Sequence, residues 1–110
     1  MVDVTVDGGP DLAHVRLRSP TWELNVRAPY AGLAGLRAIR DADWAARRSL
    51  RVGTCAGVPV HWAYADGSVA VLVGADDESW DVAVLVPVAV VDTIVAACAG
   101  GDGQKNSSRS

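Results

Sequence analysis

Apolar and polar residues alternate along much of the chain with a period of two, which is typical of strands that bury one face. The N-terminal third shows three such stretches, at residues 2–7, 13–18 and 21–27. The turn Asp7–Asp11 and the dipeptide Ser19-Pro20 separate them. Close pairing around Ser19-Pro20 would set Leu17 opposite Trp22 and Arg16 opposite Glu23. A tight turn there requires a cis peptide bond at Pro20, and a wider loop is the alternative.

The second half of the chain predicts a β-meander. Leu50 and Val52 begin a strand that we expect to turn over Gly53–Gly57. The next strand ends before Asp66-Gly67, a strong hairpin signal, which predicts pairing of Tyr64 with Val69 and of Trp62 with Val71. A further strand covers 80–86. Both faces of this meander are apolar, so we expect cover on each face from helices or from another subunit.

Helical spacing appears in two places, each after a proline. Pro29 precedes apolar residues that recur at helical intervals up to Ile39, and Asp41 or Asp43 could cap a further turn at Trp44. A second helix is predicted from Pro87 to about Ala99, ending at Gly100-Gly101. This helix is apolar nearly all round, as expected for a buried helix or one in an interface.

The predicted fold class is therefore α+β. We expect an antiparallel sheet of about six or seven strands, one helix after the third strand and one C-terminal helix. The chain has 110 residues, so one domain is predicted over 1–99, followed by a disordered polar tail at 100–110. The run 82–99 is almost long enough to span a membrane, but Pro87 and Asp92 lie within it and argue for a soluble domain.

Composition and charge restrict the function classes. The chain is rich in Val and Ala and uses Arg almost to the exclusion of Lys, which suggests GC-rich bacterial DNA. Two cysteines and no visible signal peptide favour the cytoplasm. The net charge of −3 argues against general nucleic-acid binding. Residues 11–51 hold eight Arg against four acids, whereas residues 52–104 hold seven acids and no Lys or Arg. These halves could steer a charged partner, but mutual neutralisation is favoured.

Two charged clusters are the predicted partner-binding residues. The first is acidic and lies in a predicted hairpin loop, where a solvated loop tip is the simpler interpretation. It lacks the spacing of a calcium loop, so contact with a basic protein is a better functional interpretation than a metal site. The second joins adjacent arginines to a nearby tryptophan, a combination that suits recognition surfaces, although ion pairing with acids is the simpler interpretation. The residues are Asp76, Asp77, Glu78, Asp81, Arg47, Arg48 and Trp44.

A ligand pocket is the alternative site. It would lie between sheet and helices and be lined by His61, Trp62, Tyr64 and Trp80. His61 could act as a general base, and Cys55 is close enough in sequence to suggest a Cys/His pair. A packed histidine beside a buried thiol is the simpler interpretation. The sequence shows no zinc spacing, no phosphate loop and no catalytic signature, so no metal and no cofactor are predicted.

The function expected from these features is a small non-catalytic protein-interaction module. Its concrete forms are a bacterial immunity- or antitoxin-like inhibitor, or an accessory subunit, by analogy at the level of fold. A homodimer through the last helix or the open sheet face is a side prediction. The alternative is a small-ligand-binding protein or small enzyme using the pocket, and the third hypothesis is Arg-mediated nucleic-acid binding.

Overall fold

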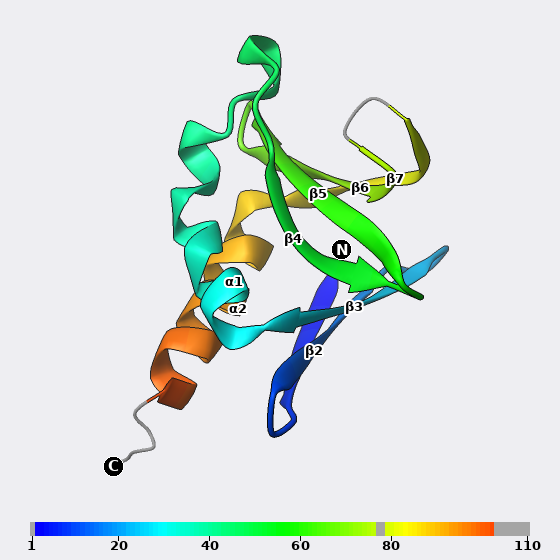
Figure 1. The fold of residues 1–110 in the computed structure, drawn as a ribbon. Coiled ribbons are helices and arrows are strands. Elements are labelled where there is room, and N and C mark those ends of the chain that lie inside the picture. Colours follow the sequence, from blue (N-terminus) through cyan, green and yellow to red (C-terminus); the bar gives the residue numbers. More distant parts are fainter. Residues whose placement is uncertain (1, 77–78, 103–110) are drawn as a thin grey trace.

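The computed structural model describes the backbone of residues 2–76 and 79–102 and confirms the α+β class (Figure 1). Seven antiparallel strands form one sheet in chain order. The strands are β1 (Asp3–Gly8), β2 (Leu12–Arg18), β3 (Glu23–Pro29), β4 (Leu50–Cys55), β5 (Val58–Ala65), β6 (Ser68–Gly74) and β7 (Trp80–Pro87). The helices are α1 (Tyr30–Ala34), the 3-10 segments η1 (Gly35–Asp41) and η2 (Trp44–Ala46), and α2 (Val88–Asp102).

The core lies between the sheet and the helices. Figure 1 shows the α1–η1 segment and α2 side by side on one side of the sheet, and they contact each other. Alternate residues of β2 and β3 point into this core, as the period of two predicted. The largest fully buried side chain is Trp62 of β5, whose indole Nε1–H donates a 3.0 Å hydrogen bond to the Val52 carbonyl of β4.

The predicted hairpin at Asp66-Gly67 is confirmed. Tyr64 pairs with Val69 and Trp62 with Val71, as the turn chemistry required. Both turn residues have positive φ, 48° at Asp66 and 81° at Gly67. A two-residue turn of this kind fixes the register of the strands that it joins.

The close pairing predicted for β2 and β3 was wrong, because their register differs from it by two residues. Leu17 lies opposite Leu24, and Arg16 opposite Asn25. The wider loop is the one formed: the Ser19 N–H donates to the Trp22 carbonyl, and the described peptide bonds are trans. A shift of two residues keeps every side chain on its face, so the core-facing pattern was right although the pairs were not.

The predicted turn over Gly53–Gly57 was also wrong at its start. Gly53 lies within β4, and the chain reverses only at Ala56 and Gly57, which have φ of 51° and 84°. Gly53 has φ of 80° at a register shift in the β4–β5 pairing. A Cβ there would lie 2.8 Å from the Arg27 carbonyl of β3, so only glycine fits this irregularity.

The first helix is divided rather than continuous. It is α-helical only to Ala34 and continues as a 3-10 helix to Asp41. Its buried residues Leu33, Leu36 and Ile39 recur every three positions, which matches the three residues per turn of a 3-10 helix. Asp43 caps η2, as one of the two predicted alternatives, by accepting from the Ala45 N–H at 3.1 Å.

The C-terminal helix starts one residue later and ends later than predicted. Pro87 is the last residue of β7, and α2 continues through Gly100 and Gly101 to Asp102. Its covered face includes Val91, Ile94 and Cys98, while residues such as Asp92 are exposed. One face of the helix is thus buried, rather than nearly all of it. The disordered tail was predicted at 100–110; residues 100–102 belong to α2 instead, and residues 103–110 lie outside the described residues.

The two halves of the chain share one plan. In each, three consecutive antiparallel strands lead through a proline into a helix: β1–β3 into α1, and β5–β7 into α2. Each helix start is tied to the first hairpin of its own half. The Tyr30 hydroxyl donates to the Gly9 carbonyl, and the Val88 N–H donates to the Gly67 carbonyl. The sequence showed no convincing repeat beyond the two prolines, so this correspondence is one of structure.

Candidate functional site

The exposed apolar side chains of the described residues gather on β7. Four large hydrophobic residues are exposed, namely Leu12, Trp80, Val82 and Leu85, and only Leu12 lies elsewhere. Trp80 and Val82 are 45% and 44% exposed, and Leu85 is 67% exposed. β7 is the last strand of the sheet order, so one of its edges pairs with β6 and the other has no strand beside it among residues 2–76 and 79–102. We name Trp80, Val82 and Leu85 the β7 surface.

The core extends under only part of β7, and this explains the exposure of Val82. Along the inner face, Val86 is buried, Val84 is half-buried and Val82 is exposed. α2 begins directly after Pro87, so helix cover is complete at that end of the strand. The N-terminal half of β7 continues past the core. Its side chains are therefore apolar without being covered, which is typical of an interaction surface.

The acidic loop precedes the β7 surface directly. Asp76 Oδ1 accepts a 2.6 Å hydrogen bond from the Ser79 N–H, which closes the loop, and Asp81 is an exposed carboxylate on β7. Asp77 and Glu78 lie outside the described residues. Within the part of the chain that is described, no group of three His, Cys, Asp or Glu side chains could hold a metal ion.

The predicted Arg and Trp cluster does come together in space. Arg47 has a left-handed backbone with φ of 59°, and its guanidinium carbon lies 5.4 Å from the centroid of the Trp44 ring. This is a cation–π contact. Arg47 and Arg48 also line a surface hollow of about 390 Å³ together with Asp41 and Leu50. The cluster is a second exposed surface, at the top of Figure 1.

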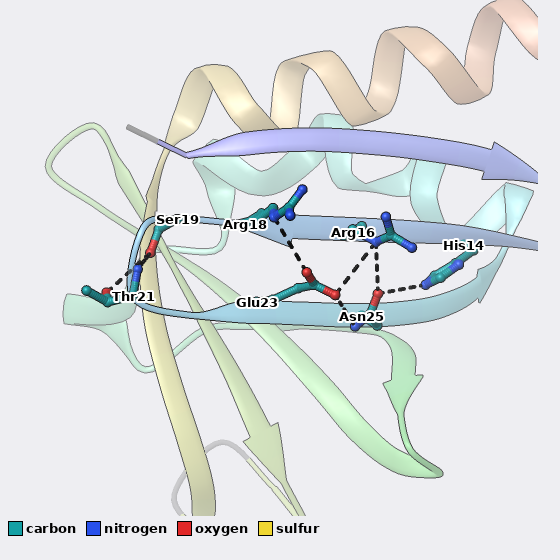
Figure 2. A network of polar contacts seen from close by, with 7 residues as sticks. All are labelled: His14, Arg16, Arg18, Ser19, Thr21, Glu23 and Asn25. Carbon is teal, nitrogen blue, oxygen red and sulfur yellow. Dashed lines mark hydrogen bonds and ion pairs between the residues drawn. The ribbon is translucent and has the colours of Figure 1, made fainter.

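The outer face of β2 and β3 carries a polar network that the sequence did not reveal as a site (Figure 2). Glu23 forms ion pairs of 3.7 Å with both Arg16 and Arg18, and Asn25 Oδ1 lies 3.0 Å from His14 Nε2. These side chains point away from the helices in Figure 2. Glu23 therefore pairs with two of the eight arginines in the basic half, and its single negative charge offsets one of their two positive charges.

A hollow of about 530 Å³ adjoins this network. It opens where β3 and β4 diverge, since these strands pair only at Arg27 and Thr54. Its lining comes from two hairpins and comprises His14, Asn25, Arg27, Thr54, Ala56 and Gly57. The divergence of β3 and β4 occurs beside Gly53, which has a positive φ, and beside the register shift in the β4–β5 pairing. A pattern of apolar residues shows neither feature.

An ion pair between described residues joins the charged halves. Arg40 of η1 and Asp92 of α2 form two parallel hydrogen bonds of 2.9 Å. The carboxylate raises the pKa of Arg40, and the guanidinium lowers the pKa of Asp92, in each case chiefly through the hydrogen bond. This contact supports the interpretation that the halves neutralise each other across the fold.

The residues of the predicted pocket point in different directions. Trp62 is fully buried in the core, whereas His61 lies on the opposite face of β5, between Arg51 and Leu72 of the neighbouring strands. Trp80 lies at the sheet edge. His61 is 6% exposed, and its Nε2 has no hydrogen-bond partner.

The suggested Cys/His pair is not assembled. Cys55 pairs with Val58 and packs against the core, on the other face of the sheet from His61. Cys98 is buried on α2. The arrangement brings no nucleophile to the one buried imidazole.

Comparison with protein-family models, curated proteins and solved structures finds no match for this chain. Among the described residues, no helix is both long and apolar enough to cross a membrane.

Proposed function

We propose that this chain is a non-catalytic protein-interaction module, acting as an inhibitor or an accessory subunit of another protein. The observation that carries the proposal is the β7 surface: of the four large hydrophobic residues that are exposed in the described part of the chain, three lie on one edge strand. Soluble domains bury such side chains or use them for contact. Aromatic residues at an exposed position also supply much of the binding energy of protein interfaces.

The charged groups around this surface favour a protein ligand over a small molecule. Asp76 and Asp81 border Trp80, and an interface with an apolar centre and a charged rim is the usual arrangement between proteins. The hollows of about 530 Å³ and 390 Å³ have other linings, and the β7 surface lines neither. A rigid seven-strand scaffold that presents one apolar edge needs no chemistry of its own to bind a partner.

The test is affinity purification with the tagged full chain, followed by reconstitution from purified components. We expect one protein to be recovered in stoichiometric amount and to form a complex with the purified chain. Leu85→Lys places a charge on the β7 surface, and Leu12→Lys makes the same change at the exposed leucine outside it. Failure to recover any protein, including at low salt, would overturn the proposed function.

A further inference from the structure

We propose that β7 binds an extended, basic segment of the partner protein as an additional antiparallel strand of the sheet. This inference rests on the proposed function and names the mode of binding and the chemistry of the partner. An edge strand presents a row of unpaired N–H and C=O groups, and a strand from another chain can satisfy them. β7 spans eight residues, Trp80–Pro87, and carries one charge, Asp81.

The other edge of the sheet shows how an edge is protected. β1 spans six residues and carries Asp3 and Asp7, and the apolar residues between them are half-buried. Charged side chains along an edge disfavour the addition of a strand. β7 has no Lys or Arg and exposes Trp80, Val82 and Leu85 instead. The two edges therefore differ in the features that decide whether a strand can add.

The shared plan of the two halves indicates where the added strand lies. β3 and β7 hold equivalent positions, each being the third strand before a proline and a helix. β4 covers the outer edge of β3 in antiparallel pairing, at Arg27 and Thr54. The same edge of β7 has no such strand in the described chain. The partner segment takes beside β7 the place that β4 takes beside β3.

Side chains on both faces of β7 supply the contacts. Val82 belongs to the inner face with Val84 and Val86, whereas Leu85 lies on the outer face. Alternate residues of an added strand would pack against Val82 on one side and against Leu85 on the other. Trp80 pairs with Gly74 across a register shift, so the alternation does not place it on the face of Val82. Backbone hydrogen bonds then supply affinity, and this alternation supplies specificity.

The negative charge of the residues around β7 indicates that the partner segment is basic. Residues 52–104 contain seven acids and no Lys or Arg, and Asp76 and Asp81 flank the start of β7. A segment with Lys or Arg beside these carboxylates gains attraction and faster association. An acidic segment would meet the like charges of these carboxylates.

Charge and register disfavour a second copy of this chain. Residues that lie opposite each other in an antiparallel pair share a face of the sheet. When a twofold axis relates two copies of β7, one central residue must therefore lie opposite its own copy, and the other residues pair symmetrically around it. Pairing about Ala83 sets Asp81 opposite Leu85, and pairing about Val84 sets it opposite Pro87. Both arrangements leave two carboxylates without a cation on either strand. The chain's own segment 103–110 offers no apolar residue to cover Trp80 or Val82.

The experiment is a titration of the ¹⁵N-labelled full chain with two synthetic peptides, matched to β7 in length and alternating Val with Thr. One peptide has Lys at its ends and the other has Glu. We expect the Lys peptide to shift the amides of residues 80–87 and the Trp80 indole N–H, and the Glu peptide to bind at least about tenfold more weakly. Leu85→Lys should abolish these shifts, and Leu12→Lys should leave them unchanged.

Four results would overturn the inference: equal binding of both peptides, no binding of either, shifts confined to other elements, or a dimer by light scattering that Leu85→Lys dissociates. A purified partner that binds Leu85→Lys and wild type equally would overturn binding at β7 while leaving the interaction function intact. The absence of any partner would instead remove the proposed function.

Discussion

Arg40 and Asp92 join the basic and acidic halves of the chain through two hydrogen bonds of 2.9 Å between the guanidinium and the carboxylate. Each residue is about half exposed, so the pair is accessible to solvent and salt. It joins η1 to α2, which lie in the helical layer on one side of the sheet. Its effect on stability should therefore be measurable but modest, and sensitive to ionic strength.

The first prediction concerns this pair and pH. Its guanidinium lowers the pKa of Asp92, so the folded state binds that proton less readily than the unfolded state. The stabilisation is complete above the ordinary pKa of 3.8 and disappears as the pH falls through the lower value in the folded state. Urea unfolding should show Asp92→Asn less stable than wild type at pH 7, with the difference closing below pH 3.8 and shrinking in high salt. A difference that is constant with pH would contradict this account.

The second prediction concerns the irregularity in β4. Gly53→Ala should destabilise the fold by roughly 1–3 kcal/mol from its φ of 80°, with an added cost from the 2.8 Å approach to the Arg27 carbonyl. Gly57 is the matched control, because its φ is 84° but a Cβ there meets nothing within 4 Å. Urea denaturation should therefore place Gly57→Ala between wild type and Gly53→Ala. Equal stability of the two variants would show that the close approach has no consequence.

The third prediction compares two tryptophans. Trp62→Phe leaves the buried Val52 carbonyl without its donor, which costs about 1–3 kcal/mol before any effect on packing. Trp80→Phe changes a side chain that is 45% exposed and should leave the unfolding free energy nearly unchanged. Thermal and urea unfolding of both variants measure this contrast. A Trp80→Phe variant as unstable as Trp62→Phe would show that β7 is part of the core.

The fourth prediction concerns nucleic acid. Glu23 offsets Arg16 and Arg18, and Asp92 offsets Arg40, so the basic half presents less free charge than its eight arginines suggest. We expect the chain to pass through heparin at physiological salt. Glu23→Gln should increase retention at low salt, because it releases two guanidinium groups. Strong, salt-dependent retention of the wild type would favour the nucleic-acid hypothesis instead.

The sequence predicted local features well where one turn or one period determines them. Asp66-Gly67 set the register of β5 and β6 because a two-residue turn leaves no freedom. Ser19-Pro20 did not set the register of β2 and β3, because the pattern of apolar residues does not determine the geometry of the four-residue loop Ser19–Trp22. Gly53 was assigned to a turn, since a glycine in a strand and a glycine in a turn look alike in sequence.

The surfaces were harder to predict because they depend on distant segments. Arg40 and Asp92 are 52 positions apart, and the hollow beside His14 lies where β3 and β4 diverge from their pairing at Arg27 and Thr54. Val82 follows the same alternation as the buried Val86, and the place where α2 begins decides which of them is covered. Periodicity assigns a residue to a face, but the extent of the core comes from tertiary packing.

Amide hydrogen exchange of the full chain, alone and with its purified partner, shows whether β7 is the edge that binds the partner. We expect rapid exchange at β7 amides that face the open edge, and marked protection of residues 80–87 in the complex, with β1 (Asp3–Gly8) unchanged. Protection that appears instead at Trp44–Arg48, with none at β7, would contradict this expectation and assign binding to the Arg and Trp surface.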